Sequence, residues 1–231
     1  MSTIASNLQA VRAEITSSAA LAGRPDDAVH LLAVSKTFPA SQLREAYQAG
    51  QISFAESYLQ EALNKISDTA DLPIEWHFIG PVQSNKTRLI AEHFDWVHSV
   101  DRLKIAERLS AQRPACFPGL QLCVQVNISG EATKSGVSPC EVSELAHAIV
   151  KLPNITLRGL MAVPAPSDEM PVQRAAFQRV RQLYDQLNRE GLKLDTLSMG
   201  MSHDFRAAIA EGATMVRVGS AIFGNRIYNK G

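Results

Sequence analysis

Short apolar runs alternate with longer stretches of helical periodicity along nearly the whole chain. The runs are rich in β-branched residues and have the length of buried strands rather than of helices. They predict eight strands, at residues 29–35, 52–55, 75–79, 96–99, 120–127, 156–162, 196–198 and 215–218. A further helix, around residues 3–22, precedes the first strand.

The stretches between the runs have the apolar stripe of amphipathic helices. Gly191 is expected to end the helix before strand seven, and the stripe of that helix is formed by Phe177, Val180, Leu183, Tyr184 and Leu187. Another helix is expected to begin at Ser138, because Pro139 suits the first helical position and Glu141 completes a capping box.

Regular strand–helix alternation predicts a parallel sheet with helices on its outer face. A doubly wound sheet commonly has about six strands, whereas eight strands in about 250 residues are typical of a (β/α)8 barrel. The 231 residues fit one such barrel and include no linker or low-complexity segment. We therefore predict an α/β chain with a single domain over 1–231, in which 1–28 form the N-terminal helix and lead-in and 29–226 form the TIM-type barrel.

Composition narrows the class of protein. The 23 Lys and Arg balance the 23 Asp and Glu, and 45% of residues are apolar, which argues against disorder. The zero net charge gives no support to nucleic-acid binding, although a local basic patch would be compatible with it. No apolar run is long enough for a membrane span or a signal peptide. The three cysteines lack a CxxC pair, so we expect reduced thiols in a cytoplasmic protein and no metal site.

In a (β/α)8 barrel the chemistry lies at the carboxyl ends of the strands. Lys36 directly follows strand one. Burial there would lower the pKa of its amine, which favours a Schiff-base nucleophile. The alternative is a structural lysine paired with a carboxylate such as Glu56.

Other strand ends carry less specific candidates. His77 on strand three is a candidate acid, base or ligand contact, but a lone histidine in a sheet is more often a core residue with satisfied hydrogen bonds. Asn127 ends strand five and is equally suited to capping a turn. Met161 and Ser198 end strands six and seven.

Two glycine-containing loops give the strongest signal. Residues 198–202, which include Met199 and Gly200, lead into a predicted helix at 204–211 with Ser202 as its cap; Gly219 and Ser220 follow strand eight. Loops after strands seven and eight with a helix N-terminus commonly bind phosphate in this fold. Two ordinary tight turns are the alternative.

Arg217 lies on strand eight, two residues before Gly219. If a pyridine ring lay between Lys36 and these loops, the guanidinium would donate to the ring nitrogen and keep it unprotonated. The alternative is an arginine in a salt bridge inside the barrel.

Taken together, these residues give the chain a clear resemblance to one family. The segments that carry it, in order, are LAVSKT at 32–37, WHFIGPVQSNK at 76–86, VNI at 126–128, KSG at 134–136, RGLM at 158–161, LSMGMS at 197–202 and VRVGSAIFG at 216–224. The chain resembles the pyridoxal phosphate homeostasis proteins, which are single-barrel relatives of the alanine racemase N-terminal domain.

The resemblance implies pyridoxal 5′-phosphate (PLP) held as an internal aldimine on Lys36, with the phosphate on the two loops and Arg217 facing the ring nitrogen. It also implies intracellular PLP homeostasis or delivery without established catalysis, with PLP-dependent apoenzymes as recipients. Apart from the resemblance, we expect a monomer, because the barrel is lean and the sequence shows no obvious apolar patch. We expect the cofactor-binding set to be Lys36, Ser57, His77, Asn127, Met161, Ser198, Met199, Gly200, Ser202, Arg217, Gly219 and Ser220.

One segment departs from the family's usual pattern. Where the family has Phe-Gly-Glu-Asn-Tyr after strand two, this chain has an alanine at 55 and a serine at 57. Ser57 shortens a contact beside the ring and its lysine, and Ala55 is expected to disfavour a backbone conformation that glycine allows. Weaker or altered PLP retention is the resulting hypothesis.

Two enzymatic readings stay open. A racemase-like enzyme would use Lys36 as a base and would need His77 or Tyr58 as its opposite-face partner. A PLP-free aldolase would use Lys36 on a phosphorylated sugar. The loop at 129–136, with Lys134, is either a mobile cationic entrance or an ordinary exposed loop.

Overall fold

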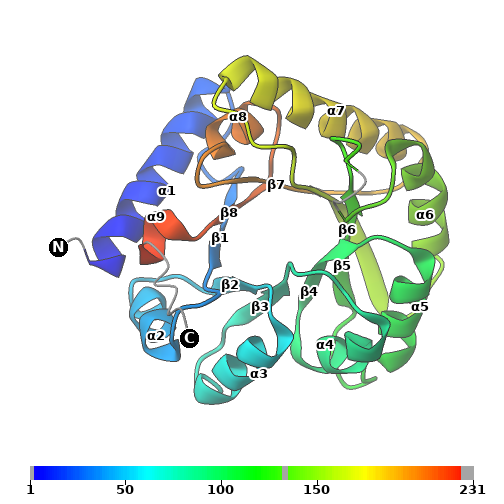
Figure 1. Cartoon of the computed structure of the whole chain (residues 1–231), viewed down its shortest axis with the longest axis horizontal. Coiled ribbons are helices and arrows are strands. Elements are labelled where there is room, and N and C mark those ends of the chain that lie inside the picture. The colour runs from blue at the N-terminus through cyan, green and yellow to red at the C-terminus, as the bar shows by residue number, and fades with distance from the viewer. Residues whose placement is uncertain (1–2, 132–134, 225–231) are drawn as a thin grey trace.

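Eight parallel strands close into a barrel in the computed structural model, which describes residues 3–131 and 135–224. Their bounds are β1 His30–Val34, β2 Ser53–Glu56, β3 Glu75–Phe78, β4 Trp96–Val100, β5 Leu120–Val126, β6 Ile155–Ala162, β7 Thr196–Met201 and β8 Met215–Val218. The strands follow one another in chain order, and β1 closes the ring by pairing with both β2 and β8 (Figure 1). The predicted (β/α)8 barrel is confirmed, except that its expected last residues, 225 and 226, lie outside the described residues.

Helices surround the barrel on its outer side (Figure 1). They are α1 Ile4–Leu21, α2 Ala40–Gln48, α3 Leu59–Asp68, α4 Thr87–His93, α5 Leu103–Gln112, α6 Val142–Ile149, α7 Met170–Arg189, α8 Phe205–Ala210 and α9 Ser220–Phe223, with 3-10 turns at Ser84–Lys86 and Pro139–Glu141. Within the described ranges, none of these helices is both long and apolar enough to cross a bilayer.

The N-terminal helix α1 is formed as predicted. Thr3 caps it by accepting a hydrogen bond from the backbone N–H of Ser6. Its buried stripe recurs every three or four residues, as expected of an amphipathic helix, and consists of Ile4, Leu8, Val11, Ile15 and Ala19. The helix lies beside α8 and α9, so the first and last described helices of the chain are neighbours (Figure 1).

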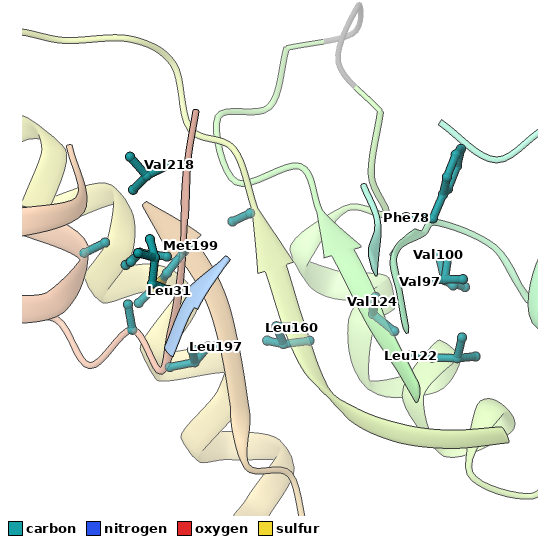
Figure 2. Packing of buried hydrophobic residues seen from close by; sticks show 14 of the residues in the cluster. Leu31, Phe78, Val97, Val100, Leu122, Val124, Leu160, Leu197, Met199 and Val218 are labelled. Carbon is teal, nitrogen blue, oxygen red and sulfur yellow. The ribbon is translucent and has the colours of Figure 1, made fainter. Parts of the chain in front are cut away.

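Side chains on alternate strand positions point to opposite sides of the barrel wall. The outward set is apolar and packs with the helices in one continuous core. Figure 2 shows part of this core, with Leu31 and Met199 on one side of the view and Val97 and Leu122, which are register partners on β4 and β5, on the other. Burying this layer is what drives the barrel to close.

The inward set differs in character. Small apolar clusters, one around Leu32 and Ala55 and the other around Trp96 and Met161, fill only part of the interior. The rest is polar. The inward polar side chains that are buried to 4% exposure or less include Ser53, His77, His98, Ser198 and Arg217. Because buried polar groups need hydrogen-bond partners, this interior must be organised by specific contacts.

Two predicted side-chain caps are wrong, although both helical segments begin within one residue of the predicted start. Ser138 occupies the N-cap position of the 3-10 turn that leads into α6, with Pro139 as the first residue of that turn, but its hydroxyl bonds to the Glu141 carboxylate instead of a backbone N–H. Ser202 does not cap α8 either; Asp204 is the N-cap residue, and its carboxylate accepts the Met201 N–H at 2.6 Å. In both places a hydrogen bond between neighbouring polar groups replaces the cap that the local sequence pattern predicts.

The end of the long helix α7 follows the prediction. Gly191 has a φ of +96°, which glycine adopts without strain. Its N–H bonds to the carbonyl of Asn188 and ends the helical ladder.

Candidate cofactor site

Lys36 lies just beyond the carboxyl end of β1, with its side chain half-buried. Its Nζ donates to Ser57 Oγ at 3.4 Å. It lines a cavity of about 170 Å³ together with Val34, Ile79, Met201, Ser202, His203, Arg217, Gly219 and Ser220. The predicted lysine and both predicted loops thus meet at one hollow.

A buried ion-pair cluster lies beneath this lysine. Lys65 on α3 donates to Glu56 Oε1 at 2.7 Å, to Glu61 Oε1 at 2.5 Å and to the carbonyl of Ser35 at 2.7 Å. Ser35 Oγ also donates to Glu56 Oε1 at 2.7 Å. Burial raises the pKa of Glu56, and Lys65 and Ser35 oppose that rise. We call Ser35, Glu56, Glu61 and Lys65 the Lys65 cluster.

The Lys65 cluster holds the backbone on both sides of Lys36. Lys65 binds the carbonyl of Ser35, and the Glu61 carboxylate accepts the N–H of Thr37 at 2.5 Å. Thr37 has a φ of +72°, a conformation that costs free energy for a residue with a Cβ. The cluster therefore fixes the segment that aims the Lys36 side chain.

The two glycine loops play different parts. A Cβ at Gly219 would lie 3.0 Å from the carbonyl oxygen of Val34, so glycine lets the loop after β8 lie against the strand that carries Lys36. Gly200 has a φ of +96° and packs on α8, where a Cβ would lie 2.7 Å from Ala208 Cβ. The hydroxyls of Ser202 and Ser220 are joined across the loops at 3.3 Å.

The expected helix contribution to anion binding is smaller than predicted. The helix after β7 is α8, with six residues, and the helix after Gly219 is α9, with four. Such short helices offer backbone N–H groups and little macrodipole, since the dipole grows with the number of aligned peptides.

Arg217 lies inside the barrel, 4% exposed, and reaches the cavity wall. Its Nη1 donates to the carbonyl oxygen and hydroxyl of Ser198 at 2.6 and 2.8 Å, and its Nη2 donates to the carbonyl of Ala162 at 2.9 Å. Desolvation lowers its pKa to about 10, which leaves the guanidinium charged at neutral pH. The alternative of a salt bridge is not found among the described residues, where carbonyls and a hydroxyl hold this arginine.

His77 does not line the cavity; it lies deeper in the barrel. Its Nδ1 is 2.9 Å from His98 Nε2, and its Nε2 is 2.9 Å from Glu75 Oε2. Burial lowers the pKa of His77 and lowers that of His98 well below the usual range. Both imidazoles are therefore neutral at pH 7.

Glu75 ends this row of side chains at the amino-terminal mouth of the barrel. The hydrogen bond from His77, aided by those from Ser53 and Trp96, lowers its pKa to about 2. A carboxyl whose pKa falls on folding contributes stability above its unfolded pKa, and that contribution disappears as the pH falls toward the folded pKa.

We expect Glu75→Gln to lower the free energy of unfolding at pH 7. The difference from wild type should shrink as the pH falls from 4.5 toward 2, because wild-type Glu75 then loses the same charge. Urea denaturation at several pH values measures this, with Asp26→Asn, an exposed residue at the same mouth, as the control. A difference that does not vary with pH would contradict the assignment.

The remaining predicted residues are spread around the site. Met161 packs with Trp96 and Cys123 inside the barrel, and Met199 lies in the outer core. Asn127 ties the loop after β5, because its Nδ2 donates to the carbonyl of Glu131 at 2.8 Å and its Oδ1 accepts the Gly130 N–H at 3.1 Å. Lys134, expected in an entrance loop, lies outside the described residues.

The structure shows what Ala55 and Ser57, the two departures from the family's usual pattern, do to the backbone and to the contact with Lys36. Ala55 is a regular, fully buried residue of β2 and does not have a positive φ, so the expected backbone cost is absent. Ser57 faces Lys36 through the 3.4 Å contact. Gly80 allows the Ser57 backbone to lie this close, since a Cβ at this glycine would lie 2.1 Å from the carbonyl oxygen of Ser57.

Several residues of the site were missed by sequence reasoning. His98 shares the inward side of β4 with Trp96, and strand alternation alone indicates this. Lys65 and Glu61 have the i, i+4 spacing of a helical ion pair, but nothing local connects them with Lys36. His203 follows Ser202 directly and lines the cavity.

An amine, two glycine and serine loops, and a buried cation around one cavity suit an anionic carbonyl compound. The fold and this site define a barrel of the alanine racemase N-terminal domain class, and the family model "Alanine racemase, N-terminal domain" matches residues 6–226. The chain is 61% identical over 228 residues to the pyridoxal phosphate homeostasis protein of Pseudomonas aeruginosa, covering 99% of this chain and 98% of that one. It is 51% identical to the Escherichia coli protein of the same name, with 100% of both chains covered. The chain belongs to the pyridoxal phosphate homeostasis protein family.

Solved structures agree with this family. PipY of Synechococcus elongatus superposes with a TM-score of 0.86 at 38% identity, covering 96% of this chain and 100% of PipY. A second PipY structure, with PLP bound, gives a TM-score of 0.84 at 37% identity. Alanine racemase of Clostridium difficile shares only the fold, at 17% identity and a TM-score of 0.70, and 53% of its chain is covered.

Proposed function

We propose that this chain binds PLP on Lys36 and serves in intracellular PLP homeostasis or delivery. The observation that carries the proposal is the meeting of Lys36, Arg217 and both glycine loops around one cavity. The family's name and the PLP bound to PipY support the choice of PLP as the ligand.

The residues present fit the parts of PLP. The cofactor supplies an aldehyde that reacts with amines and a ring that withdraws electrons. The Lys36 amine is the nucleophile for the aldehyde. Ser202, Gly219 and Ser220 offer hydroxyls and backbone N–H groups to the phosphate.

Arg217 would face the ring nitrogen as a donor. A guanidinium cannot accept a hydrogen bond, so that nitrogen stays unprotonated and the ring is a weaker electron sink. This favours a protein that holds PLP over one that uses it in turnover.

The positions of the two partner candidates also favour a carrier over a racemase-like enzyme. Tyr58 is 56% exposed, and both nitrogens of His77 are engaged below the cavity. We also propose a single-barrel domain over 1–231, and the match to relatives named for PLP homeostasis over 98–100% of their length supports it. We further propose a cytoplasmic monomer that passes PLP to PLP-dependent apoenzymes.

Titration with PLP tests the proposal. The cofactor-free protein should bind about one equivalent and develop a visible absorption band. Gly219→Leu should weaken binding about tenfold or more, because its side chain would occupy the space between the loop and Val34. A wild-type protein that develops no band would contradict the proposal.

The matched control is Gly119→Leu. Gly119 lies just before β5, at the opposite mouth of the barrel, and a Cβ there would make only an ordinary contact, 3.4 Å from Thr156 Oγ1. Its PLP affinity should equal that of wild type. Unfolding curves of both variants separate lost binding from lost stability.

A further inference from the structure

A continuous row of hydrogen bonds crosses the barrel interior from the amino-terminal mouth to the cavity. Glu75 Oε2 lies 2.9 Å from His77 Nε2, and His77 Nδ1 lies 2.9 Å from His98 Nε2. His98 Nδ1 lies 2.8 Å from Ser198 Oγ, which accepts from Arg217 Nη1 at 2.8 Å. We call these five residues the interior chain.

The groups at its two ends fix the donor-to-acceptor direction of every hydrogen bond along the interior chain. The Arg217 guanidinium has only donors, so Ser198 Oγ must accept from it and can give its own proton to His98 Nδ1. His98 then carries its proton on Nε2 and donates to His77 Nδ1. His77 likewise carries its proton on Nε2 and donates to the Glu75 carboxylate, which accepts only.

Each hydrogen bond is consistent with the protonation state of the two groups that it joins. Neutral imidazole has one donor and one acceptor, and burial keeps both histidines neutral. The Glu75 carboxylate is ionised and is fixed further by Ser53 Oγ at 2.7 Å and Trp96 Nε1 at 3.1 Å.

We propose that the interior chain positions Arg217 for the cofactor, with Glu75, His77 and His98 as positioning residues. Glu75 at the far mouth holds both histidines in the Nε2–H tautomer, so His98 Nδ1 accepts the Ser198 hydroxyl proton and the lone pairs of that oxygen are left for Arg217. The guanidinium is then held from behind, and its remaining N–H groups serve the cavity that it lines. This proposal rests on the proposed function for the identity of the ligand.

Other charged and titratable groups around the interior chain are accounted for. Arg158 lies over the Trp96 ring and is paired with Asp195, and Asp95 accepts the backbone N–H of Trp76. Burial raises the pKa of Cys123 to about 12, so its thiol is neutral. Near the two ends lie His30, which bonds to Ser53, and Asp204, which favours the charged form of Arg217. Lys36 and His203 line the cavity together with Arg217.

The tautomers can be read directly by ¹⁵N NMR of the histidine rings in the cofactor-free protein. His77 and His98 should both be neutral with the proton on Nε2 at pH 7. In Glu75→Ala, which removes the terminal acceptor, both should become tautomer mixtures. Wild-type rings that are charged, or that carry the proton on Nδ1, would overturn the proposal.

The consequence for binding uses PLP as the probe. Glu75→Ala should weaken PLP binding about fivefold, the size expected from one lost buried hydrogen bond. Glu75→Gln keeps an acceptor oxygen and should restore the Nε2–H tautomers and most of the affinity. Asp26→Ala, at the same mouth, should bind as wild type does.

A folded Glu75→Ala variant with wild-type affinity would overturn the positioning role. The two proposals fail separately. A wild type without PLP binding contradicts the proposed function, while the tautomers, measured without cofactor, still decide whether the interior chain exists.

Discussion

Lys36→Ala should abolish the visible absorption band of the PLP complex and weaken PLP retention about a hundredfold or more. The substitution removes the amine that forms the covalent link, and only the contacts of the loops and Arg217 remain. Absorption titration and dialysis of loaded protein measure the two effects.

Lys36→Arg separates the chemistry of this residue from its charge. Arginine keeps the positive charge near the phosphate but is not a nucleophile at neutral pH, so it should fail as alanine does. Lys86→Ala, an exposed lysine on the 3-10 turn after β3, should leave binding unchanged. Full retention of the band in Lys36→Arg would show that the link lies elsewhere.

The second large effect is on stability. Lys65→Met should lower the free energy of unfolding by about 3–5 kcal/mol, the cost of leaving a buried charge without its partner. The Lys65 side chain is 6% exposed and that of Glu56 is 0% exposed. Glu56 Oε2 already has no hydrogen-bond partner within the described structure, so the carboxylate has little other support.

Two further variants make this prediction specific. Glu56→Gln added to Lys65→Met removes the stranded charge and should recover part of the loss. Arg44→Met breaks the exposed pair with Asp71 and should cost less than about 1 kcal/mol. Equal losses in Lys65→Met and Arg44→Met would contradict the role given to the Lys65 cluster.

The barrel and the lysine could be predicted because their signals are local. Short apolar runs indicate the strands and thus their alternation with helices, and Lys36 directly follows one of these runs. The glycine loops after β7 and β8 were recognisable for the same reason. Their side-chain detail was not, since the cap position belongs to Asp204, the first residue of the predicted helix, and not to Ser202 two residues earlier.

The supports of the site could not be predicted because they join distant segments. Lys65 reaches Ser35 across 30 residues, and His98 reaches Ser198 across 100. Single polar residues on strands give no hint of such partners, so we assigned His77 to the cofactor, whereas its two nitrogens bond to Glu75 and His98 and neither is left for the cavity. A polar residue inside a barrel meets its hydrogen-bond partners only when the strands close into a ring, so the sequence around it does not identify them.

The most direct test of the account is to find where PLP is attached. Loaded protein is reduced with borohydride, digested, and its peptides are identified by mass spectrometry. We predict one pyridoxyl group, on the peptide that contains Lys36. A label on Lys86 or Lys134, or no label on any lysine, would contradict it.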